Sequence, residues 1–157
     1  MSKIVEAIGK TSRYDADFYE WAKEQAAALR ERHYELLDFE NLAEEIEGLA
    51  RSDRRELRSR VVQILVHLLK CQFQPGRRSR SWEATLASQR TEIEAVVRDS
   101  PSLRREVPEL ITDAYASARR IAAKEIRLEQ LSERFPMTCP WSVEQVLDPD
   151  FYPAPAE

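Results

Sequence analysis

Residues 61–73, VVQILVHLLKCQF, constrain the fold of this chain more than any other segment. Nine of these thirteen residues are apolar, and a helix that is apolar around most of its circumference must be surrounded by other elements. Gln74-Pro75-Gly76 then ends the helix, because proline cannot continue the hydrogen-bond ladder and glycine permits a reversal. A second amphipathic run begins at Trp82. We therefore predict an antiparallel helical hairpin at the centre of a helical core.

The composition favours one all-α domain. The chain has 157 residues, only three glycines and 33% charged residues, and its many Ala, Leu, Glu and Arg residues are typical of helices. We predict an antiparallel bundle of four main helices with short accessory helices and an extended C-terminal tail. The helices are expected near residues 15–33, 38–73, 81–99 and 107–126. The domain is expected to span 14–153, with the tail from 135, between a flexible N-terminal arm (1–13) and a disordered end (154–157).

Apolar residues recur at helical period along the second predicted helix. They form one stripe, which comprises Phe39, Leu42, Ile46, Leu49, Ala50, Leu57, Val61, Ile64 and Leu68. The stripe continues past Gly48 and Asp53, which favours one continuous helix of about 35 residues. The alternative is a new helix that begins at Ser52 or Asp53, with Asp53 and Glu56 as a capping pair.

Capping residues suggest where the other elements begin. Asp15 is expected to cap the first helix, Asp38 the second and Ser81 the third. The sequence Ser142-Val143-Glu144-Gln145 has the form of a capping box on a short helix. The tail is expected to lie across the bundle and bury its aromatic residues, which are Phe135, Trp141, Phe151 and Tyr152.

Charge and cysteine content restrict the class of protein. A net charge of −4 argues against general affinity for nucleic acid, which normally requires a basic surface. The two cysteines, Cys71 and Cys139, have no CxxC spacing, which fits a reducing compartment. No window has the length and apolar content of a signal peptide or a membrane span. We therefore predict a cytoplasmic protein that does not bind membranes.

The histidines do not have the spacing of a bundle metal site. A ferritin-type site needs Glu-x-x-His pairs, whereas Arg30 and Ile64 lie three residues before His33 and His67. We predict no metal, no cofactor and no catalytic residue. His67 is expected to be a rim histidine on a narrow polar strip, and the alternative is a general base at the mouth of a groove.

Two glutamines occupy positions that the apolar period assigns to the core. Gln72 and Gln89 lie on the two arms of the predicted hairpin, and a buried amide must be hydrogen-bonded. We predict a structural role, which is either to fix the register of the hairpin or to tie down the backbone of the turn at residues 75–81, and a small polar pocket is the alternative.

The predicted turn carries a basic cluster beside an aromatic residue. Arg77, Arg78 and Arg80 precede Trp82, a combination that can hold a phosphate or stack on a base. Arginines on an exposed turn also pair with nearby acids or neutralise a helix C-terminus. These residues, together with His67, Gln72 and Gln89, are the candidate binding site.

Several strings resemble a known bacterial family when taken together. They are ENLAEEIEGL, HLLKCQFQPGRRSRSW with the following ATLASQR, DSPSL and CPWSVEQVLDPDFYP. The chain is identified by them as a member of the family described as domain of unknown function number twenty-nine, from about Tyr14 to Pro153. The resemblance implies a compact helical domain that is usually a complete protein. It brings no established activity and therefore assigns no functional residues.

The function expected from these features is that of a small protein-interaction module, an adaptor or regulatory partner without catalysis. Its partner is expected to be another protein, and a homo-oligomer is compatible with the sequence. One alternative is binding of nucleic acid or a phosphate ligand through the turn at residues 77–80. A second alternative is an enzyme with a site near His67.

Overall fold

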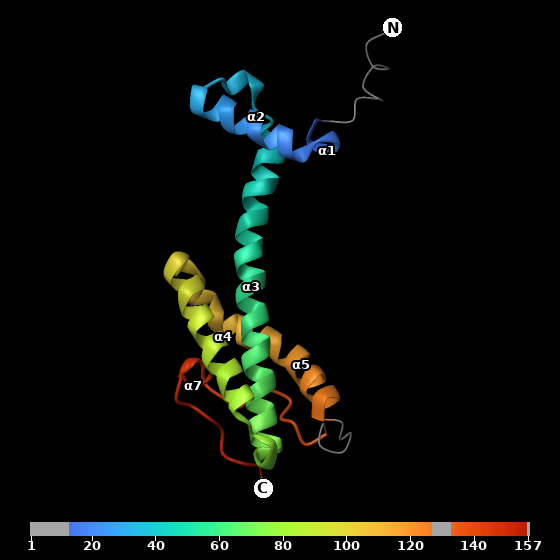
Figure 1. Cartoon of the computed structure of the whole chain (residues 1–157), viewed down its shortest axis with the longest axis vertical. Helices are drawn as coiled ribbons and strands as arrows, with labels where there is room; N and C mark the ends of the chain where they lie inside the picture. Colours follow the sequence, from blue (N-terminus) through green and yellow to red (C-terminus); the bar gives the residue numbers. More distant parts are fainter. Residues whose placement is uncertain (1–12, 127–132, 157) are drawn as a thin grey trace. The chain divides into compact units, whose positions relative to one another are not determined.

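The computed structural model describes residues 13–126 and 133–156, and within them it is helical without any strand (Figure 1), which confirms the all-α class. The long helices are α2 (Phe18–Glu31), α3 (Phe39–Phe73), α4 (Arg80–Asp99) and α5 (Val107–Ile126). Shorter elements are α1 (Arg13–Ala16), α7 (Val143–Leu147) and the 3₁₀ helices η1 (Tyr34–Leu36), η2 (Pro75–Arg77) and η3 (Pro101–Glu106).

The contacts divide the chain into two units where the sequence predicts one domain. The N-terminal unit is Met1–Ala50 and the C-terminal unit is Arg51–Glu157, and each is described by itself. The predicted arm of residues 1–13 lies outside the described residues, except for Arg13, which begins α1.

The structure has two helices, α1 and α2, where the sequence predicts one helix that begins at Asp15. The N-cap of α2 is Asp17. Asp17 has an extended backbone (φ −154°), and its carboxylate accepts a hydrogen bond from the backbone N–H of Glu20 at 3.0 Å. Asp15 lies inside the short α1. Gln25 then holds the chain after α2: its amide donates to Leu36 O at 3.3 Å and accepts from Asp38 N at 2.7 Å.

Helix α3 is continuous through Gly48 and Asp53, as the unbroken stripe predicts. Asp38 lies at its start and accepts a hydrogen bond from Asn41 N at 3.2 Å, as expected. The alternative cap, Asp53, instead accepts a hydrogen bond from the hydroxyl of Ser100 at 3.2 Å.

The core of the C-terminal unit is built by the second part of α3 together with α4 and α5, which lie along it in Figure 1. The fully buried side chains include Leu57, Val61, Ile64, Leu65, Leu68, Leu69, Leu86 and Leu110. Ser79, not Ser81, caps α4, and its hydroxyl accepts from Trp82 N at 3.4 Å. Ser79 has the extended backbone that a cap requires, whereas Ser81 is already within the first turn.

The tail packs against this core. The predicted capping box is present in α7, and Phe135 and Trp141 are buried. The end of the tail, predicted to be disordered, is hydrogen-bonded at Ala156, whose backbone N–H donates to Gln72 O at 2.8 Å.

Arg90 of α4 fastens the tail. It is buried, and its guanidinium donates to the carbonyl oxygens of Val146, Pro149 and Phe151 at 3.0, 3.2 and 3.1 Å. Burial away from water lowers the pKa of Arg90. The side chain is therefore part of the structure and not part of the exposed basic cluster.

Candidate functional site

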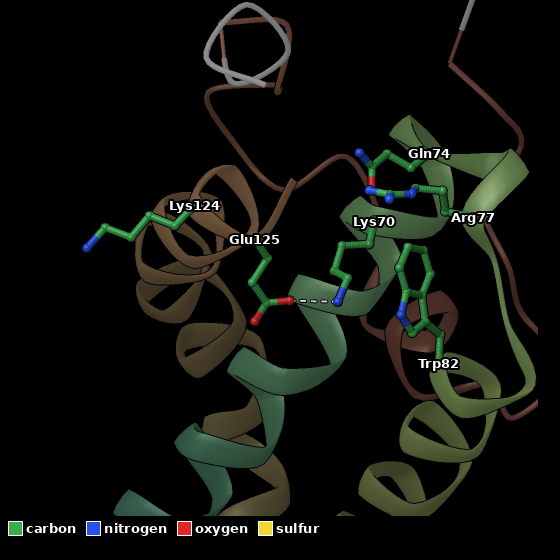
Figure 2. Close-up of a pocket in the computed structure, with 6 residues that line it drawn as sticks. All are labelled: Lys70, Gln74, Arg77, Trp82, Lys124 and Glu125. Atoms are coloured by element: carbon green, nitrogen blue, oxygen red, sulfur yellow. Dashed lines mark hydrogen bonds and ion pairs between the residues drawn. The ribbon is translucent and has the colours of Figure 1, made fainter. Parts of the chain in front are cut away.

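A pocket lies at the end of the α3–α4 hairpin, where the sequence places the candidate site. Its volume is about 540 Å³, and it is lined by Lys70, Gln74, Arg77, Trp82, Lys124 and Glu125 (Figure 2). The Gln-Pro-Gly sequence brings Lys70 and Trp82 together, because it ends α3 and returns the chain as α4. The end of α5 adds Lys124 and Glu125 to the lining.

An ion pair occupies the centre of this pocket. Lys70 Nζ lies 2.6 Å from Glu125 Oε2 and 4.5 Å from the centroid of the Trp82 ring. The Lys70 side chain is only 11% exposed. Figure 2 shows that the ammonium group of Lys124 points away from Lys70 and Trp82. Lys70 is thus already paired, and its contacts join α3, α4 and α5.

The three arginines of the predicted cluster have different surroundings. Arg77 lines the pocket. Arg78 donates to Glu83 Oε1 at 2.8 Å, and its guanidinium lies 3.9 Å from the Tyr152 ring centroid. Arg80 is exposed at the start of α4. The structure therefore brings Arg77 and Trp82 together and gives Arg78 a packing role against the tail.

No hydrogen bond joins Gln72 or Gln89 to the backbone of the turn among the described residues, and Gln89 instead links the two arms of the hairpin. Gln89 Oε1 accepts a hydrogen bond from Arg60 Nη1 at 3.4 Å, so this amide joins α4 to α3. Gln72 Oε1 is buried without a hydrogen-bond partner among the described residues. The turn is instead held by its own backbone bonds, from Arg77 N to Gln74 O and from Arg78 N to Pro75 O.

His67 lies on α3 outside the set of residues that lines the pocket. Its Nδ1 is 2.9 Å from Gln63 O, one turn earlier on the same helix. Burial lowers the pKa of His67, and Lys70 lowers it further, while the Gln63 carbonyl and Glu125 oppose the shift. Burial raises the pKa of Cys71, which favours an unreactive thiol. Across the described ranges, no three His, Cys, Asp or Glu side chains converge as metal ligands.

The N-terminal unit has an exposed surface that sequence reasoning missed. Its large apolar side chains at the surface are Phe18, Tyr19, Leu29, Tyr34, Leu36, Phe39, Ile46 and Leu49, against Ile121 and Met137 in the C-terminal unit. On α3, Phe39, Ile46 and Leu49 are 63%, 65% and 70% exposed. Together with the half-buried Leu42 they form what we call the α3 apolar face. The sequence places these residues on one stripe with the buried Leu57 and Val61, and the stripe is exposed in this part of α3.

The limited core of the N-terminal unit explains this exposure. The buried side chains of α2 are Trp21, Gln25 and Ala28, and η1 buries none. With only three buried positions on α2, the N-terminal unit has few side chains that could cover the apolar residues of α3. The helical period of α3 indicates which residues share a side, but it does not indicate what covers that side.

The geometry defines an all-α protein with a tightly packed C-terminal unit and an N-terminal unit that exposes an apolar helix face. The chain belongs to the family described as Domain of unknown function DUF29, which matches residues 13–152 and hence nearly the whole chain. No curated protein and no solved structure matches it. In the described part of the chain, every helix falls short of the length and apolar content that would let it cross a membrane.

Proposed function

We propose that this protein is an interaction module, an adaptor or regulatory partner that binds another protein and has no catalysis of its own. The observation that supports this is the α3 apolar face. Each Å² of apolar surface removed from water stabilises a complex by roughly 25 cal/mol before the costs of association. Contiguous exposed apolar surface on a soluble protein is typical of interaction sites.

Other residues of the same unit can extend the contact. Tyr34 and Leu36 of η1, and Phe18 and Leu29 of α2, are about half exposed or more. Aromatic side chains at a surface supply large contact areas with few rotatable bonds. A stable interface buries roughly 800 Å² on each partner, so contacts beyond the α3 apolar face are expected.

We also propose a cytoplasmic location. Cys71 and Cys139 are both free thiols, which is typical of proteins in a reducing compartment. Fractionation of the source cell tests this directly, and recovery of the protein outside the cytoplasm would contradict it.

The interaction is tested by site-specific photo-crosslinking in the source cell. A photoactivatable residue replaces Leu49 in one variant and Ile46 in another, and the matched control carries it at Ile121, an exposed apolar residue of the C-terminal unit. We expect one reproducible adduct of defined mass from positions 46 and 49 and none from position 121. An adduct with a second copy of the chain would also support an interaction role.

The proposal fails if positions 46 and 49 give no adduct while the protein is present at its normal level. It also fails if position 121 gives the same adducts, because the contact would then not depend on the α3 apolar face.

A further inference from the structure

The two units have opposite net charge. The N-terminal unit contains twelve acidic and six basic residues, for a net charge of −6 with His33 neutral. Residues 51–157 contain sixteen acidic and eighteen basic residues, for a net charge of +2. The exposed apolar side chains are therefore concentrated on the unit that is net negative.

Acidic residues border the α3 apolar face. Glu40 and Glu47 each follow a residue of the face by one position, so both lie along the same edge of it at about 100° per residue. Glu44 lies on that side of the helix as well. None of the residues from Phe39 to Ala50 is basic. A partner helix that lies on the face would meet a negative edge.

This charge distribution discriminates between possible occupants. A second copy would bring two units of net charge −6 together, and such like-charge contact opposes association. A neutral helix would gain only the apolar contact, and an acidic helix would also be repelled by the negative edge. A helix with Lys and Arg beside its apolar stripe gains both terms, because long basic side chains can cover apolar surface and still reach the carboxylates.

We infer that the α3 apolar face binds an amphipathic helix of a partner protein whose apolar stripe is flanked by lysine and arginine. This inference rests on the proposed function and names the chemistry of the partner. The twelve residues from Phe39 to Ala50 form about three helical turns, or roughly 17 Å. A partner helix of about three turns or more, with apolar anchors at positions i, i+3, i+4 and i+7, can cover that length.

The inference is tested with designed peptides and the full chain. Three peptides of 16 residues share one composition of apolar residues: the first has lysine flanks, the second has glutamate flanks, and the third scrambles the lysine peptide so that no apolar stripe forms. Isothermal titration calorimetry at about 0.15 M salt, where screening leaves only short-range charge effects, measures the dissociation constants. We expect the lysine peptide to bind at least about tenfold more tightly than the other two.

Two variants locate the binding. Ile46→Gln with Leu49→Gln should weaken binding of the lysine peptide by about tenfold or more, whereas Ile121→Gln should not change it. Glu40→Lys with Glu47→Lys should reverse the preference toward the glutamate peptide. The matched control, Glu94→Lys with Asp113→Lys in the C-terminal unit, makes the same change in net charge and should keep the original preference. Circular dichroism confirms that each variant is folded.

Three outcomes overturn the inference. Equal binding of the lysine and glutamate peptides would show that charge does not select the partner. If the Glu40/Glu47 pair and the Glu94/Asp113 pair of lysine substitutions weaken binding of the lysine peptide equally, the net charge of the chain explains the effect and the edge of the α3 apolar face does not. If no peptide binds and sedimentation shows a dimer that Leu49→Gln dissociates, the occupant is a second copy. The proposed interaction function stands if such a dimer is found, or if crosslinking from position 49 captures a partner that has no basic helix. In both cases only the inferred chemistry of the partner is wrong.

Discussion

The two parts of α3 carry the same apolar period and have opposite surroundings. In the C-terminal unit, Leu57, Val61, Ile64 and Leu68 are fully buried, because α4 and α5 lie along the helix. In the N-terminal unit, Phe39, Ile46 and Leu49 are mostly exposed. Helical period specifies which side chains share a face, and burial depends on whether other elements supply a cover. An uncovered continuation of a core stripe is therefore a candidate contact surface.

The largest expected effect is the difference in stability between an alanine substitution in the buried part of this stripe and one in its exposed part. Ile64→Ala removes packed atoms and leaves a cavity, so we expect a loss of about 2–5 kcal/mol in the free energy of unfolding. Leu49→Ala should change the free energy of unfolding by less than about 0.5 kcal/mol, since its side chain is exposed. Urea unfolding measures both. A comparable loss from both substitutions would mean that the α3 apolar face is covered within the isolated protein.

The next effect concerns the tail that covers the core of the C-terminal unit. Arg90→Met keeps most of the apolar stem and removes the three hydrogen bonds to the tail carbonyls, so we expect a loss of about 2–3 kcal/mol. Limited proteolysis should then cut within residues 142–156 sooner than in the original protein. Arg80→Met, at an exposed position on the same helix, is the matched control. If Arg90→Met leaves both the unfolding and the cleavage unchanged, the tail is held mainly by Trp141 and Val146.

Much of the fold could be predicted from the sequence because local chemistry determines it. The length of α3, the start of α5 and the capping box at Ser142 follow from period and capping residues. Asp17 caps α2 in place of Asp15, and Ser79 caps α4 in place of Ser81. In each pair the cap is the residue with a non-helical backbone, and two residues of the same type so close in sequence are equally good candidates. Sequence spacing alone does not show these backbone angles.

The candidate site was less predictable because it depends on contacts between distant residues. Lys70 pairs with Glu125, which lies 55 positions away, and Arg90 bonds to carbonyls that have no side-chain signature. The arginines at 77, 78 and 80 are adjacent in sequence, yet Glu83 and Tyr152 engage only Arg78. A basic cluster in a sequence therefore does not establish a shared basic surface.

A smaller effect is expected at Gln72, where the buried amide oxygen has no described partner. Gln72→Met has a similar shape and removes that unsatisfied acceptor, so we expect a gain of up to about 1 kcal/mol in the free energy of unfolding. The backbone bond from Ala156 to Gln72 O does not involve the side chain and should persist. A loss of more than about 1 kcal/mol would show that the amide is satisfied in solution, for example by an ordered water.

The smallest effect is a pH dependence that reports how closely the buried part of α3 excludes water. Burial holds the pKa of His67 below its ordinary value, so the folded state binds fewer protons at this residue than the unfolded state does. The free energy of unfolding is therefore highest, as far as His67 is concerned, above the unfolded pKa of about 6.5. It falls as the pH drops through that value toward the lower pKa of the folded state. His67→Gln should flatten the dependence of the free energy of unfolding between pH 7.5 and 5.5, measured by urea unfolding at each pH. His33→Gln, in the N-terminal unit, should leave the slope for the C-terminal unit unchanged. If His67→Gln leaves the slope of the free energy of unfolding against pH unchanged, water reaches the imidazole. The tight packing of this part of α3 then does not extend to the side of the helix that carries His67.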